Sequence, residues 1–153
     1  MKRNMIAIGF LSLATTVWAG PTDGPIDSIL EDYLRIQSAL ASDTTKGVHE
    51  AARSMQDKAA SITVADSEVG GLVHAIVRAA SKIKETTGLE AARVEFFELS
   101  KPLLVYLNKH HSAKADYYRY FCPMAEKAWI QSEEEIKNPY HGSSMLGCGT
   151  LIE

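Results

Sequence analysis

The sequence has few of the features that mark common classes of protein. Its 153 residues include only two cysteines, which are too far apart to form the Cys-x-x-Cys motif of a thiol redox enzyme. Its net charge of -3 argues against a nucleic-acid binder, because neutralising phosphates requires a basic face. Glycine-rich phosphate loops, paired-histidine zinc motifs and serine nucleophile elbows are also missing. The sequence therefore predicts neither an enzyme nor a nucleic-acid partner.

Long apolar runs are also scarce, and the clearest one lies at the N-terminus. Lys2 and Arg3 precede an apolar stretch over residues 6–14, and Val17-Trp18-Ala19 suits a signal peptidase. The apolar stretch is too short for a membrane span, which takes about 20 residues. We therefore predict a signal peptide over residues 1–19, cleaved after Ala19. The mature chain is expected to be a periplasmic protein with no membrane span, in an oxidising compartment.

Apolar residues recur every three or four positions in four separate stretches, which is the period of a helix with one buried face. These stretches run from Ile26 to Leu40, from Val48 to Ile62, from Val69 to Ile83 and from Leu89 to Tyr106. No alternating pattern typical of a strand reaches a useful length. We therefore predict one all-α domain over residues 20–153. Its expected architecture is an antiparallel four-helix bundle with an irregular C-terminal tail, residues 115–153, packed on it.

Sulfur-containing residues are concentrated in that tail. Pro123 favours an extended backbone at Cys122, so that the side chains of Cys122 and Met124 can point the same way. Met145 and Cys148 are three residues apart and would align on one helical turn. Thiolate and thioether sulfurs are soft ligands that select Cu(I) over hard cations. The sequence thus predicts a Cu(I) site with these candidate ligands: Cys122, Met124, Met145 and Cys148, with His141 in reserve.

A disulfide is the alternative interpretation of the same residues. Cysteines of exported domains commonly pair, and a Cys122–Cys148 bridge closing about 25 residues would stabilise the fold by roughly 3–4 kcal/mol. Met124 and Met145 would then fill gaps where the tail packs on the bundle. Such a protein would be an interaction module that docks onto a partner in the cell envelope and binds no metal. Both interpretations stay open, and oxidation of the pair would remove the thiolates that hold copper.

Two further segments of the tail have local signals. Ser132 and Glu135 fit a capping box that would begin a short helix, which Asn138-Pro139 must end. The run Asn138-Pro139-Tyr140-His141-Gly142 predicts a tight turn, in which glycine is free to adopt a positive φ.

Several of these residues together resemble a known family. They are Cys122-Pro123-Met124, Trp129, Glu135-Ile136-Lys137-Asn138-Pro139-Tyr140, Gly142 and Met145-Leu146-Gly147-Cys148-Gly149. The run from Ala92 to Ser100 also resembles the family's arginine, phenylalanine and serine pattern on its last long helix. The family is an exported helical domain of uncharacterised function. It occurs alone and at the C-terminus of periplasmic adaptor subunits of copper/silver efflux systems.

The resemblance implies a periplasmic helical bundle associated with heavy-metal handling, with copper as the usual metal. The four sulfur residues match the family pattern, whereas His141 stands where the family usually has an aromatic residue. The chain lacks the other parts of an efflux adaptor. We therefore expect a free-standing protein for metal tolerance or delivery, whose partner is a copper/silver efflux component or another envelope protein.

Overall fold

A computed structural model describes residues 26–109 and 117–152 of the protein. The predicted signal peptide, residues 1–19, lies outside these described residues. Four helices come first along the chain: α1 (Asp27–Ala41), α2 (Val48–Ser61), α3 (Ser67–Glu85) and α4 (Leu89–Lys109). Three short strands and a 3-10 turn follow: β1 (Tyr118–Cys122), β2 (Lys127–Gln131), η1 (Gly142–Ser144) and β3 (Thr150–Ile152).

The four predicted helices are confirmed, and their apolar faces form the core. The fully buried side chains of this core include Ile29, Tyr33, Ile36, Leu40, Val48, Met55, Ile76, Ile83, Phe96, Leu99 and Leu103. A local signal also fixes the start of α3. The side chain of Asp66 caps α3 by accepting hydrogen bonds from the backbone amides of Glu68 at 2.7 Å and Val69 at 2.9 Å. No helix within the described ranges is long and apolar enough to cross a bilayer.

The prediction of a purely α-helical fold with an irregular tail is wrong, because the tail forms a small antiparallel sheet. The strand order is β2-β1-β3, and Tyr120 of β1 pairs with Trp129 of β2 and with Leu151 of β3. The longest of these strands has five residues, which is too short for a clear alternating pattern. In β2, moreover, three consecutive residues from Trp129 to Gln131 are buried, so that the alternation expected of a half-buried strand is lost.

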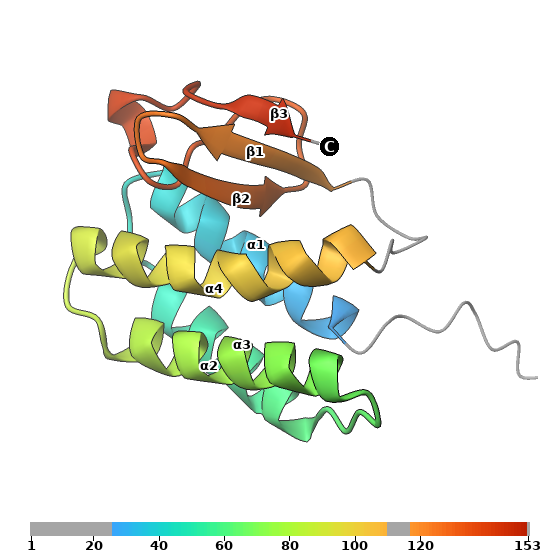
Figure 1. The fold of residues 1–153 in the computed structure, drawn as a ribbon. Helices are drawn as coiled ribbons and strands as arrows, with labels where there is room; N and C mark the ends of the chain where they lie inside the picture. The colour runs from blue at the N-terminus through green and yellow to red at the C-terminus, as the bar shows by residue number, and fades with distance from the viewer. Residues whose placement is uncertain (1–25, 110–116, 153) are drawn as a thin grey trace, which may run out of the picture.

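The molecule has three layers, with α1 and α4 in the middle (Figure 1). The sheet covers one side of this middle pair, and β2 contacts both of its helices. Helices α2 and α3 pack on each other on the opposite side, where α2 also contacts α1 and α3 contacts α4. The tail therefore adds a layer to the helical core, and Trp129 of β2 is fully buried.

The predicted short helix beginning at Ser132 is also wrong. Residues 132–135 form successive bends. The buried side chain of Gln131 donates from Nε2 to the carbonyl oxygens of Glu133 and Glu135, both at 2.7 Å. These hydrogen bonds satisfy the backbone of the segment without a helix.

Candidate functional site

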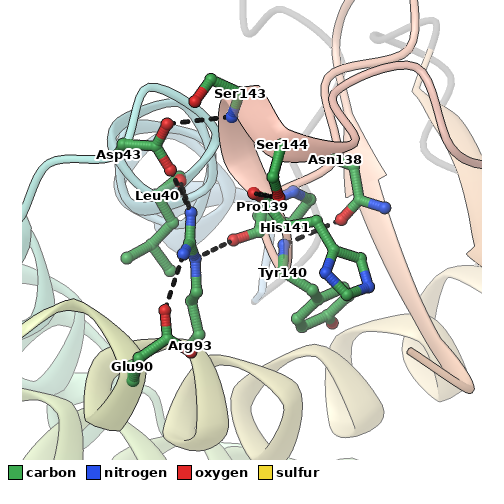
Figure 2. Close-up of polar contacts among 10 residues, drawn as sticks. All are labelled: Leu40, Asp43, Glu90, Arg93, Asn138, Pro139, Tyr140, His141, Ser143 and Ser144. Atoms are coloured by element: carbon green, nitrogen blue, oxygen red, sulfur yellow. Dashed lines mark hydrogen bonds and ion pairs between the residues drawn. The ribbon is translucent and has the colours of Figure 1, made fainter. Parts of the chain in front are cut away.

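A buried arginine attaches the segment Asn138–Gly149, which we call the hook, to the helices (Figure 2). Arg93 of α4 is 6% exposed. Its Nε donates to the carbonyl oxygen of Pro139 at 2.9 Å, and its Nη2 donates to that of Leu40 at 3.0 Å. The carboxylates of Asp43 and Glu90 pair with the guanidinium at 2.6 and 2.9 Å. A guanidinium tolerates burial only with such partners, so Arg93 joins α1, α4 and the hook.

Asp43 extends this network into the hook. Its Oδ2 accepts a hydrogen bond from the backbone amide of Ser143 at 2.9 Å. Hydrogen bonds from Ser143 and from the Arg93 guanidinium lower the pKa of Asp43 to about 2. Gly142 has a φ of 55°, and a Cβ there would collide with the Asp43 carboxylate and the Arg93 guanidinium. The predicted glycine turn is therefore confirmed, and only glycine fits at this position.

Asn138 stabilises the hook through hydrogen bonds to other residues of the same segment. Its side chain is fully buried. Oδ1 accepts from the amide of Tyr140 at 2.8 Å, and Nδ2 donates to the carbonyl oxygen of Cys148 at 2.7 Å. The backbone of Asn138 bonds to the Leu146 carbonyl at 2.9 Å and to the Gly142 amide at 3.0 Å. One residue thus fixes the path of the chain that leads to Cys148.

Tyr140 anchors the hook between the sheet and α4. Its hydroxyl donates to the carbonyl oxygen of Ala128 at 2.7 Å and lies 3.5 Å from the hydroxyl of Ser100. Its ring packs against Trp129 and Phe96, with centroids 6.0 and 5.9 Å away. Burial raises the pKa of Tyr140 well above its ordinary value. These polar and aromatic motif residues therefore have structural roles.

This attachment brings the two cysteines together. Cys122 ends β1, and Cys148 lies in the hook just before β3. Their Sγ atoms are 3.2 Å apart, although 26 residues separate them along the chain. No disulfide joins them in this structure, in which Cys122 is fully buried and Cys148 is partly exposed.

The surroundings of this pair favour a negative charge on the buried sulfur. Burial raises the pKa of the Cys122 thiol, but hydrogen bonds outweigh this effect and lower it overall. The donors are the Cys148 thiol, the Ala125 amide at 3.4 Å from Sγ, the Asn138 side chain and the Met124 amide. The pKa of Cys148 is raised because its thiol bonds to Cys122. Cys122 is therefore the more acidic thiol of the pair.

The two methionines lie close to the pair along the backbone and are exposed. Met124, in the turn between β1 and β2, is 69% exposed, and Met145 is 37% exposed. The backbone amide of Met124 lowers the pKa of both cysteine thiols, and the carbonyl oxygen of Met145 accepts from the Cys148 amide at 3.0 Å. A thioether with so much exposed surface as Met124 fills no gap in a core. Packing therefore does not account for Met124.

His141 lies in the hook beside Tyr140 (Figure 2). Its Nε2 is buried and has no hydrogen-bond partner among the described residues. Within residues 26–109 and 117–152, no three side chains of histidine, cysteine, aspartate or glutamate are grouped closely enough to hold a metal ion. The structure thus does not group His141 with both cysteines.

The cysteine pair fits a soft metal ion after a small adjustment. Bonds from zinc to thiolate are about 2.3 Å long, so two sulfurs in tetrahedral positions on one such ion lie about 3.8 Å apart. From 3.2 Å, the pair would have to open by about 0.6 Å. Cys148 can supply this movement, because it follows Gly147, at which even an added Cβ would meet nothing within 4 Å.

Reasoning from the sequence assigned no positioning role to Asp43, Arg93 or Asn138, although Arg93 and Asn138 belong to the segments that resemble the family. A usable signal existed for Arg93, since it lies four residues after Leu89 and three before Phe96. Helical periodicity places it on the apolar face of α4, where a charged side chain requires buried partners. No comparable signal identified Asp43, which lies in the short connection between α1 and α2.

One known family matches the chain. Its description is "Protein of unknown function (DUF3347)", and the match covers residues 29–115, more than half of the sequence. This range contains nearly all of the four helices, whereas the three strands and the hook lie beyond it. The chain has no match among curated proteins or among solved structures.

Proposed function

We propose that this chain, which belongs to the family described as "Protein of unknown function (DUF3347)", is an exported protein that binds Cu(I). Cys122 and Cys148 are the main ligands in this proposal. Met124 and Met145 complete the coordination from the exposed side, and His141 is a reserve ligand. The role of the protein is metal tolerance or delivery in the periplasm.

A single observation carries the proposal: two cysteine sulfurs lie 3.2 Å apart, one buried and one partly exposed, and an exposed methionine lies within three residues of each cysteine along the chain. Thiolate and thioether donors suit Cu(I) better than zinc, magnesium or calcium. Hydrogen-bond donors around Cys122 favour the thiolate form that a metal ion requires. The hook fixes the backbone at Cys148 while leaving its side chain partly exposed, so that an ion can enter from solvent.

The resemblance of the tail to a domain of copper/silver efflux adaptors supports the choice of metal. A component of such a system, or another envelope protein, would donate or accept the ion. Under this proposal the helices form the scaffold and the tail forms the binding site.

A disulfide-closed interaction module is the second candidate, and the same distance favours it. A disulfide bond is about 2.05 Å long, so the two sulfurs would have to approach by roughly 1.2 Å. The bond would close the hook onto β1 and stiffen a surface for a partner in the cell envelope. In that case no metal would bind to the native protein.

An anaerobic Cu(I) titration against a competing chelator separates the two candidates. The mature protein is fully reduced and compared with Cys148→Ser, with the double variant Met124→Leu/Met145→Leu and with Met55→Leu. Loss of an outer-shell partner commonly weakens metal binding by about 10–100-fold, so loss of a direct ligand should cost roughly 100-fold or more. We expect that loss in Cys148→Ser and a smaller loss in the double variant.

Met55→Leu is the matched control, because Met55 is fully buried in α2 and belongs to the helical core. It should bind Cu(I) like the unsubstituted protein. Equally weak binding by the unsubstituted protein and Cys148→Ser would overturn the copper proposal and favour the interaction module. A count of free thiols on protein taken directly from the cell envelope then identifies the native oxidation state.

A further inference from the structure

The two sulfurs of the pair differ in their access to solvent. Cys122 is fully buried at the end of β1, and its Sγ accepts a hydrogen bond from the Ala125 amide at 3.4 Å. Cys148 is partly exposed on the hook. Next to it, Gly147 leaves open space and Leu146 is 39% exposed. An incoming molecule can therefore reach Cys148 without moving the sheet, whereas it cannot reach Cys122.

We infer that the pair undergoes reversible thiol–disulfide exchange with another protein's dithiol or disulfide, and that the two cysteines have fixed and different roles in it. Cys148 forms the mixed disulfide with the partner. Cys122 is the resolving sulfur, which closes or releases the internal bond. The protein is the substrate of this exchange and not its catalyst.

Oxidation proceeds in two displacements. Cys148, the thiol that the partner can reach, first loses its proton to solvent, and its thiolate attacks one sulfur of the partner's disulfide. The partner's other sulfur leaves with the electron pair as a thiolate. The Cys122 thiolate then attacks Cys148 Sγ, forms the internal disulfide and releases the partner's second thiolate. The pair loses two electrons and two thiol protons, and the partner's two thiolates take up two protons through solvent, so that the partner ends as a dithiol.

Reduction is the reverse, with a partner dithiol as the electron donor. A partner thiolate attacks Cys148 Sγ, and the electron pair of the internal bond leaves on Cys122. The Ala125 amide and the Asn138 side chain face Cys122 Sγ and stabilise the departing negative charge. The sulfur that the partner can reach is therefore Cys148, and the sulfur whose negative charge is stabilised is Cys122.

This exchange would also regulate the proposed copper site, and that consequence rests on the proposed function. Metal binding needs the sulfurs to separate to about 3.8 Å, whereas the disulfide needs about 2.05 Å. The two states are mutually exclusive, so oxidation would release the ion and bound Cu(I) would block oxidation. The exchange itself does not depend on metal.

The test uses glutathione disulfide as the probe, on metal-free reduced mature protein, with mass spectrometry of quenched samples. The unsubstituted protein should end with an internal disulfide and no bound glutathione. Cys122→Ser should accumulate one glutathione on Cys148. Cys148→Ser should acquire glutathione at least roughly tenfold more slowly, because its remaining thiol is buried.

A second measurement needs no substitution. Brief alkylation of the reduced protein followed by peptide mapping should label Cys148 well before Cys122. Equal labelling of the two cysteines would overturn the assigned roles, as would equal rates of glutathione addition to the two variants. Absence of an internal disulfide in the unsubstituted protein would overturn the exchange. All these results are independent of the Cu(I) titration, so that either proposal can fail alone.

Discussion

Substitution of Gly142 by alanine tests whether the hook is built as the structure indicates. The position has a φ of 55°, and a Cβ there would strike the carboxylate of Asp43 and the guanidinium of Arg93. The new methyl group must therefore either push apart the Arg93–Asp43 pair or lift the hook from α4. In both cases the chain between Asn138 and Cys148 loses its fixed path.

The expected cost has two parts. A residue with a Cβ in the left-handed region costs about 1–2 kcal/mol. Forcing a methyl group into filled space costs about 1–3 kcal/mol more. The free energy of unfolding should thus fall by about 2–5 kcal/mol, a large share of the roughly 5–15 kcal/mol typical of a domain.

Urea unfolding followed by two probes measures this cost. After removal of residues 1–19, Trp129 is the only tryptophan, and it is fully buried in the tail, where its ring packs against Tyr120 and Tyr140. Its fluorescence reports on attachment of the tail, whereas far-UV circular dichroism reports mainly on α1 to α4. We expect Gly142→Ala to lower both midpoints and to shift the fluorescence midpoint further.

Gly147→Ala is the matched control. It adds the same methyl group to the same hook, but the space around Gly147 is open. Its unfolding free energy should stay within about 0.5 kcal/mol of the unsubstituted protein, as for most surface substitutions. A similarly small effect of Gly142→Ala would refute the packing described here.

Three further predictions concern stability. Tyr140→Phe removes the hydroxyl that donates to the Ala128 carbonyl at 2.7 Å, and leaving that oxygen unsatisfied should cost about 1–3 kcal/mol in urea unfolding; a neutral result would contradict the hydrogen bond. The folded-state pKa of Asp43, about 2, lies below the ordinary 3.8, so its contribution is present above pH 3.8 and is lost as the pH falls through about 2. Thermal melts from pH 5 to pH 2 should therefore show the stability gap between the unsubstituted protein and Asp43→Asn narrowing with acid, and a constant gap would count against this network. Gly71→Ala, at an exposed and uncrowded position inside α3, should raise the unfolding free energy by up to about 1 kcal/mol in urea, and a loss would contradict the assigned helix.

The tail motif divides into two groups by structural role. Asn138, Tyr140 and Gly142 attach the hook, and a Cβ at Gly149 would press on Trp129. These residues are needed for the fold whether or not the protein binds metal. The sulfur residues differ, because Met124 is 69% exposed and contributes little to packing. The cysteines and methionines of the motif are therefore the residues to which a function other than stabilising the fold would belong.

Helical periodicity predicted α1 to α4 because the apolar residues of each buried helix face recur every three or four positions along the sequence. Ile29, Tyr33, Ile36 and Leu40 show this directly, since all four are predicted from spacing and fully buried. The strands carried no such local pattern. Each consists of five residues or fewer, and β3 forms only by pairing with β1, about 30 residues earlier in the chain.

By itself the sequence determined the helices, the glycine turn at Gly142 and the concentration of sulfur in the tail, since these depend on neighbouring residues and on intrinsic backbone preferences. Only the tertiary structure decided that Cys122 and Cys148 meet at 3.2 Å, that Cys122 is buried and Cys148 reachable, and that Arg93 holds them in place. These features arise from contacts between residues up to 100 positions apart, such as that of Asp43 with Ser143. Such contacts form when the apolar faces of distant segments are buried together, which no local pattern records.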